Sequence, residues 1–168
     1  FSVFTPYKNA WLRRLVDDYL APRPSTSNRA RLAPPPDAKG VPSITEFGFR
    51  PTNLMQLQLA TGASGGRQLF DEFKSRIDRY DEARNFPAVR GPSYLSVHLR
   101  FGTVSLRELV PHARSLPFSG AMTWLSELIW RDFYAQILWH HPRVTGSAFK
   151  PEYADLRFPG SAEHFMAW

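Results

Sequence analysis

The longest helix that this sequence predicts is centred on Trp124-Leu125-Ser126-Glu127-Leu128-Ile129-Trp130-Arg131-Asp132-Phe133-Tyr134. Apolar residues recur through this stretch at helical spacing, and the pattern extends from about residue 119 to residue 140. Pro142 ends the helix, because proline lacks a backbone donor and clashes with the preceding turn. Helical signals dominate the whole chain after Pro51, so the body of the protein is predicted to be all-α.

One face of this helix gathers side chains that can do chemistry. Trp124, Glu127 and Arg131 follow at spacings of three and four residues, and Trp130 lies three residues after Glu127. Indole rings are flat surfaces on which a base can stack. A carboxylate beside them accepts hydrogen bonds from base N–H groups, or donates one where burial favours its protonated form. The structural alternative is an ion pair between Glu127 and Arg131 with both tryptophans in the core, and spacing alone favours it.

The front of the chain has a different pattern. Phe1-Ser2-Val3-Phe4 is an apolar run typical of a strand, and Pro6 suits the first turn of a helix that continues to Leu20. Residues 21–42 contain repeated prolines, which predict an extended linker without a packed core of its own. The expected order is therefore a β remnant, a linker and an all-α body.

The body begins with an apolar stripe and two shorter helices. The stripe consists of Leu69, Phe70, Phe73, Ile77 and Tyr80, preceded by a pair of glycines.

The first short helix is predicted over residues 93–101 and ends at Gly102. The next begins with Ser105 as its N-cap and Glu108 at the third helical position, which is a capping box.

Three further groups are candidate binding residues. Gly91-Pro92-Ser93-Tyr94-Leu95-Ser96 offers hydroxyls and backbone N–H groups to a phosphate, although ordinary helix capping is the simpler interpretation. Tyr80 and Arg84 lie four residues apart and could cover a ring and hold a phosphate, or form a plain helix end. His140-His141 could bind a metal, but adjacent histidines point apart on a helix, so capping is preferred and no metal site is predicted.

The amino-acid composition limits the classes of function that this chain could have. The 168 residues suffice for one domain or a piece of a larger one, and the absence of cysteine excludes disulfides, thiol nucleophiles and Cys-ligated metals. Lys and Arg number 21 against 15 Asp and Glu, a net charge of +6, and most of the cations are arginine. This balance favours a nucleic-acid partner or an anionic cofactor, or else it reflects a basic surface without a specific partner. No apolar run is long enough for a membrane span and no signal peptide opens the chain, so we expect a soluble, cytoplasmic protein.

Taken in order, these segments resemble the photolyase/cryptochrome family, and most of all its bacterial class I deoxyribodipyrimidine photolyases. The resemblance covers essentially the whole chain. Its most specific part is Glu-Leu-Ile-Trp-Arg-Asp-Phe-Tyr at residues 127–134. The other matching segments are residues 3–11, Tyr80 with residues 84–87, residues 93–96, residues 99–102 and residues 165–168.

The resemblance implies an architecture and a set of partners. Residues 1–20 would be the tail of an N-terminal α/β antenna domain, residues 21–57 the interdomain linker, and residues 58–168 the first part of the helical FAD-binding domain. The implied cofactors are FAD and, in the N-terminal domain, a folate or deazaflavin antenna chromophore. The implied partner is DNA containing pyrimidine dimers, and the complete protein is expected to be a monomer that does not associate with membranes.

The resemblance also assigns residues to the site. The FAD-binding residues would be Tyr80, Pro92, Ser93, Tyr94, Leu95, Ser96, Trp124 and Arg131. The catalytic residues that meet the flipped-out dimer would be Glu127 and Trp130. The DNA-binding residues would be Arg84, Glu127, Trp130, Arg131 and Tyr134. In the implied reaction, light drives an electron from reduced FAD to the dimer, the cyclobutane ring splits and the electron returns.

Two departures from the family pattern qualify this expectation. Pro92 stands where the family commonly has Thr or Ser, which removes a hydroxyl and an N–H near the phosphates. Where the family has a surface Trp that helps to reduce the flavin, the nearest aromatic residue is Phe158. A cryptochrome-like photoreceptor of the DASH type and a non-enzymatic, helical DNA-binding module therefore stay as alternatives.

We further expect the chain to be an internal fragment, because both ends lie inside apolar patterns. Such a fragment would be inactive alone, with the apolar faces of Trp124, Leu128, Phe133 and Ile137 exposed.

Overall fold

The computed structural model describes residues 1–24, 26–34, 40–57, 59–157 and 159–168. Within these residues the regular structure is entirely helical, with no β-strand, which confirms the predicted fold class. The chain divides into two compact units. One consists of residues 15–128, and the other combines residues 1–14 with residues 129–168.

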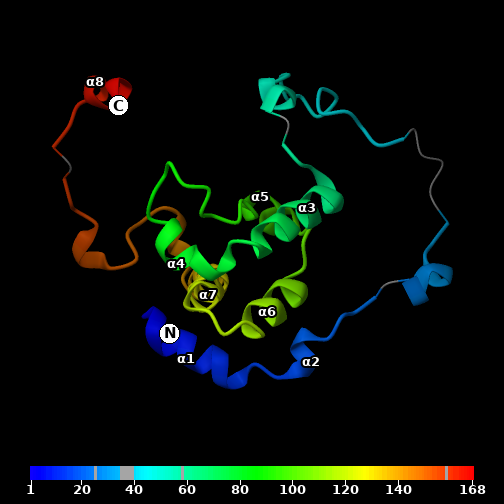
Figure 1. Ribbon diagram of the computed structural model, residues 1–168. Coiled ribbons are helices and arrows are strands. Elements are labelled where there is room, and N and C mark those ends of the chain that lie inside the picture. Colours follow the sequence, from blue (N-terminus) through cyan, green and yellow to red (C-terminus); the bar gives the residue numbers. More distant parts are fainter. Residues whose placement is uncertain (25, 35–39, 58, 158) are drawn as a thin grey trace. The chain divides into compact units, whose positions relative to one another are not determined.

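The unit of residues 15–128 contains most of the helices, which Figure 1 shows in chain order. Its α-helices are α2 (Asp17–Leu20), α3 (Gly62–Lys74), α4 (Tyr80–Ala83), α5 (Ser96–Phe101), α6 (Leu106–Arg114) and the first part of α7 (Ser119–His140). Its short 3-10 helices are η1 (Thr26–Arg31), η2 (Asn53–Leu57) and η3 (Ile77–Arg79). Helix α2 packs against α6, and α3 packs against α5.

The core of this unit is built on the predicted apolar stripe. Phe70, Phe73, Ile77 and Tyr80 are all buried, although the chain leaves α3 at Lys74 and continues as η3 and α4. Phe70 and Phe73 pack against the indole of Trp124 in α7, with ring centroids 6.0 and 4.9 Å away. Burying aromatic rings of this size supplies much of the stability of a small helical core.

Local capping signals were predicted well in this unit. Gly102 ends α5 with a φ of 67°, a left-handed conformation that glycine adopts without strain. Ser105 is the N-cap of α6, and its hydroxyl accepts a hydrogen bond from the N–H of Arg107. Helix α5 itself begins at Ser96, three residues later than predicted, because Tyr94 has a positive φ of 57°.

Two predictions for the front of the chain were wrong. The strand expected at Phe1–Phe4 is absent, because α1 (Phe4–Arg14) already begins at Phe4. An apolar run becomes a strand only where neighbouring strands accept its backbone hydrogen bonds, and the described residues contain none. The single helix expected to reach Leu20 is two helices, since Val16 has an extended backbone with φ −109° and ψ 157°.

The second unit consists of α1, the rest of α7, η4 (Pro142–Thr145), η5 (Pro151–Tyr153) and α8 (Ala162–Ala167). Helix α7 ends at His140, as Pro142 predicted. Phe133 of α7 is buried, and its ring lies 5.8 Å from Phe4 and 5.3 Å from Tyr7 of α1.

The expectation that four apolar side chains of α7 would be exposed was therefore wrong. Trp124, Leu128, Phe133 and Ile137 are between 2% and 8% exposed. Helix α3 covers Trp124 and α1 covers Phe133, so segments of this chain bury faces that we had expected later helices to bury.

The proline-rich segment forms no core in the part that the structure describes. Every described side chain between residues 22 and 57 is exposed. The domain boundaries after residues 20 and 57 stay a prediction, and residues 35–39 of the linker and Phe158 lie outside the described residues. In the described part of the chain, no helix is both long and apolar enough to cross a membrane.

Candidate functional site

A charged pair lies at the centre of the candidate site. Nη1 of Arg84 donates a short hydrogen bond to Oε1 of Glu127, and the two residues form an ion pair across 43 positions of sequence. The Arg84 guanidinium also lies 5.5 Å from the ring centroid of Tyr80. The hydrogen bond to Glu127 raises the pKa of Arg84. Burial, and then the charge of Glu127, raise the pKa of Tyr80, so its phenol stays protonated well above neutral pH.

Aromatic rings form a continuous cluster beneath this pair. Tyr80 meets Phe73 edge to face at 5.8 Å, and Phe73 in turn contacts Trp124. The structure thus brings together Tyr80, Arg84, Trp124 and Glu127, which were predicted from two separate segments of the sequence.

The side chain of Arg76 contacts the backbone of the segment of residues 91–96. Nη2 of Arg76 donates to the carbonyl oxygen of Pro92 at 3.1 Å, and Nη1 donates to the carbonyl oxygen of Glu72 at 2.9 Å. Ser93 Oγ accepts the N–H of Leu95 at 3.4 Å, and the Leu95 side chain is fully buried. These contacts fix the backbone of the segment while Ser96 and Tyr94 are exposed.

This segment also carries surplus positive charge. Burial, and then the charge of Arg90, lower the pKa of Arg76. Glu72 pairs with Arg90, so a single carboxylate faces the two cations. The Nε of Arg76 is buried and makes no hydrogen bond within the described residues. This donor set, together with the hydroxyls of Ser93 and Ser96, fits a phosphate-bearing cofactor such as FAD.

The other predicted residues of α7 belong to the second unit. Trp130 stacks face to face on Phe4, with ring centroids 3.6 Å apart and an angle of 6°, and Tyr134 stacks on Trp130 at 5.4 Å. Asp132 accepts hydrogen bonds from the hydroxyl of Tyr7 and from Nε1 of Trp11. Arg131 is exposed on the same helix.

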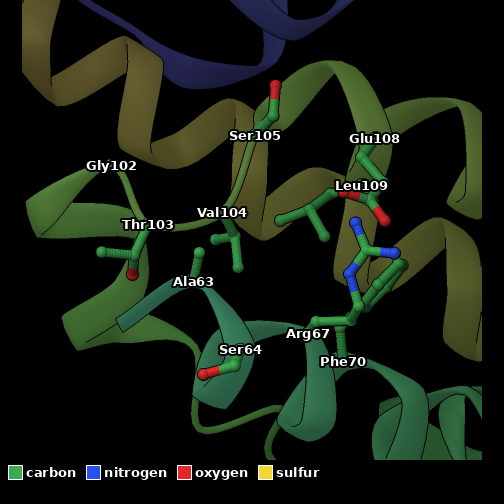
Figure 2. A pocket seen from close by; sticks show the side chains of 10 residues that line it. All are labelled: Ala63, Ser64, Arg67, Phe70, Gly102, Thr103, Val104, Ser105, Glu108 and Leu109. Atoms are coloured by element: carbon green, nitrogen blue, oxygen red, sulfur yellow. The ribbon is translucent and has the colours of Figure 1, made fainter. Parts of the chain in front are cut away.

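A cavity of about 460 Å³ lies elsewhere in the unit of residues 15–128. It is formed by the N-terminal half of α3, the loop after α5 and the first turn of α6, and Figure 2 shows the side chains of Arg67 and Glu108 at its edge. None of the residues predicted for the site lines it. Among the described residues, no group of three or more His, Asp or Glu could hold a metal ion.

Comparison with known proteins shows that this chain is similar to DNA photolyases. Residues 124–168 match the family model described as the FAD binding domain of DNA photolyase. The deoxyribodipyrimidine photo-lyase of Vibrio cholerae is 32% identical over 182 residues, and the alignment covers 100% of this chain and 37% of that protein. The proteins of the same name from Halobacterium salinarum and Neurospora crassa are each 28% identical, with all of this chain and 36% and 30% of those proteins covered.

The chain belongs to the photolyase family. It spans about a third of the length of these curated relatives. The part matched by the family model begins at Trp124, so it contains α7 from Trp124 onward and none of the segment that carries Arg84.

Sequence reasoning missed two residues that shape this photolyase-family site. Phe73 links Tyr80 to Trp124, and its place in the predicted stripe was the only signal available. Arg76 holds Pro92, and nothing in its local sequence distinguishes it from the other arginines. Local spacing favoured an ion pair between Glu127 and Arg131, whereas the structure pairs Glu127 with Arg84.

Proposed function

We propose that this chain is part of a photolyase that repairs cyclobutane pyrimidine dimers in DNA, using FAD and light. The observation that carries the proposal is the cluster of Tyr80, Arg84 and Glu127, which joins the family-specific stretch of α7 to Tyr80, one of the residues predicted to bind the cofactor. The names of the relatives support the same activity class.

In this proposal the segment of residues 91–96 holds the cofactor. The hydroxyls of Ser93 and Ser96 donate to its phosphates, and Arg76 and Arg90 neutralise their charge. Tyr80, Leu95 and Trp124 provide apolar surface for its rings. When bound in its reduced form, FAD supplies the photoexcited electron that opens the cyclobutane ring and takes the electron back.

The protein residues then handle the lesion. A dimer leaves the duplex at lower cost than an intact base pair, because it already distorts the stack. Glu127 accepts hydrogen bonds from the flipped-out bases, and Trp130 provides a stacking surface once Phe4 yields its place. Arg131 and Tyr134 are exposed and would contact the DNA backbone.

A comparison of two tryptophans tests this proposal in the protein isolated with its flavin. Trp130→Ala is expected to weaken binding to dimer-containing DNA by roughly 1–3 kcal/mol, the range for a base stacked on an aromatic ring. Trp139→Ala is the matched control, because Trp139 is on the same helix and 82% exposed. Affinity is measured by titration on matched duplexes, and light-dependent repair by loss of the dimer.

The repair measurement separates the candidate functions. Glu127→Ala should lower the quantum yield of repair more than it lowers binding to undamaged DNA. Bound flavin without any repair would indicate a photoreceptor of the cryptochrome type, and the absence of flavin would leave only a DNA-binding module. Equal effects of Trp130→Ala and Trp139→Ala would contradict the role of Trp130.

A further inference from the structure

The ion pair between Arg84 and Glu127 gives Arg84 a different task from the one that the sequence suggested. We propose that Arg84 is a positioning residue that holds the Glu127 side chain oriented toward the lesion, in place of a direct contact with DNA phosphate. This inference rests on the proposed function and specifies how one part of the lesion site is prepared before the DNA arrives.

The first argument is that protein groups already engage the Arg84 guanidinium. Its Nη1 donates to Glu127, and its flat face lies over Tyr80 at 5.5 Å. Tyr80 is 9% exposed, so the ring beneath the guanidinium is itself fixed in the core. A guanidinium with a carboxylate at its edge and a ring at its face has both of its favoured protein contacts.

The second argument is that the backbone beneath Arg84 is rigid. The N–H of Arg84 bonds to the carbonyl of Tyr80 at 3.1 Å. Gly91 packs so closely on this turn that a Cβ there would lie 2.5 Å from the carbonyl carbon of Ala83 and 2.7 Å from the nitrogen of Arg84. Arg84 thus projects from a turn that is braced by the start of the predicted cofactor segment.

The third argument concerns what Glu127 must do. Its side chain is 36% exposed and that of Arg84 is 35% exposed, so the pair lies at the boundary between core and solvent. An incoming base displaces water from such a carboxylate, and without a partner that holds it the side chain would be free to move away from the base. The hydrogen bond from Arg84 fixes the orientation of this side chain, whose oxygens accept hydrogen bonds of the kind that a base N–H donates.

A double-mutant cycle in the flavin-containing protein tests this role. Arg84→Met, Glu127→Gln and the double variant are compared for affinity to a duplex with one thymine dimer. Arg84→Met alone should weaken binding roughly tenfold, near the lower end of the range for a lost hydrogen bond to a charged group. In the Glu127→Gln background, Arg84→Met should weaken binding to the dimer duplex little further, because Arg84 acts on the lesion only through the Glu127 carboxylate.

The salt dependence of binding to undamaged duplex provides a second readout. A positioning residue should leave the slope of log affinity against log salt unchanged, whereas a lost phosphate contact lowers it by about 0.9. Lys74→Met is the matched control, because it breaks the exposed pair between Lys74 and Asp71 in the same unit and should change neither quantity.

Two results would overturn the inference. Additive effects of Arg84→Met and Glu127→Gln, or a reduced salt slope in Arg84→Met, would identify Arg84 as a phosphate contact. Where Arg84→Met fails to fold, Arg84→Gln repeats the cycle with a polar side chain of similar length. A wild-type protein without preference for the dimer duplex would contradict the proposed function itself, and the inference with it.

Discussion

At the scale of single residues, the backbone angle at the end of α5 dictates the amino acid. Gly102 adopts φ 67°, and a Cβ built there would meet no atom within 4 Å. Space is therefore not what excludes a larger residue. The cost of any side chain is the left-handed conformation itself, which places Cβ too near the following carbonyl oxygen.

Gly102→Ala should lower the free energy of unfolding by about 1–2 kcal/mol, the usual cost of that conformation for a residue with a Cβ. Gly146 supplies the control, because it also has open space around it but adopts φ −130°, which alanine tolerates. Urea titrations followed by circular dichroism measure both variants. A loss at residue 146 as large as the loss at residue 102 would show that general flexibility, and not the positive φ, explains the result.

At the scale of elements, the Asp132 carboxylate of α7 forms hydrogen bonds with two residues of α1. Asp132 accepts hydrogen bonds from Tyr7 and from Trp11, which lie one helical turn apart on α1. Burial, and then the hydrogen bond to Asp132, raise the pKa of Tyr7 above its ordinary value of 10.0. This contact stabilises the folded state for as long as the phenol keeps its proton.

The sign of the pH dependence follows from that shift. The unfolded chain loses the Tyr7 proton near pH 10, while the folded state retains it, so stability falls as pH rises above 10. The wild-type protein should therefore lose stability more steeply between pH 10 and 11 than Tyr7→Phe, and the two curves should run parallel below pH 9. Tyr80 is present in both proteins, so its own raised pKa cancels from the comparison. Parallel curves over the whole range would show that the Tyr7 hydroxyl contributes nothing through its proton.

The elements also show which features could be predicted from the sequence. Helix α7, its end before Pro142, the stop at Gly102 and the cap at Ser105 all depend on signals within a few residues. The stripe at residues 69–80 predicted core residues correctly, because burial follows periodicity even where the helix breaks.

The contacts that no local pattern could reveal join distant parts of the chain. Arg84 and Glu127 are 43 residues apart, and Tyr7 and Asp132 are 125 apart. For a single sequence, any of several arginines could have paired with Glu127, and the nearest in sequence, Arg131, was the reasonable choice. The strand expected at residues 1–4 failed for a related reason, since strand formation depends on partners elsewhere.

At the scale of the whole molecule, the chain carries an excess of positive charge that bears on the proposed binding of DNA. The net charge is +6, and 17 of the 21 cations are arginines, since only Lys8, Lys39, Lys74 and Lys150 are lysines. Arginine binds phosphate through two parallel hydrogen bonds as well as through its charge. The proposed partner, DNA, presents phosphates at regular spacing along its length.

Binding to undamaged duplex DNA should therefore depend steeply on salt. Two or three phosphate contacts reduce the affinity roughly 10- to 40-fold between 50 and 200 mM salt, since each contributes about −0.9 to the logarithmic slope. Fluorescence anisotropy with a labelled duplex measures this slope, and a duplex with an uncharged methylphosphonate backbone is the control. Comparable binding to the uncharged duplex would show that charge does not drive the association.

Helix α7 passes without interruption from one compact unit into the other, and the boundary between Leu128 and Ile129 lies in its buried middle. Either unit can open alone only by fraying this helix back to that point, which breaks successive backbone hydrogen bonds next to two buried side chains. We therefore expect the amide hydrogens around this boundary to exchange with solvent more slowly than those near the ends of α7. In a titration with urea, this continuity of the helix that carries Glu127 and Trp130 is expected to couple the unfolding of one unit to that of the other.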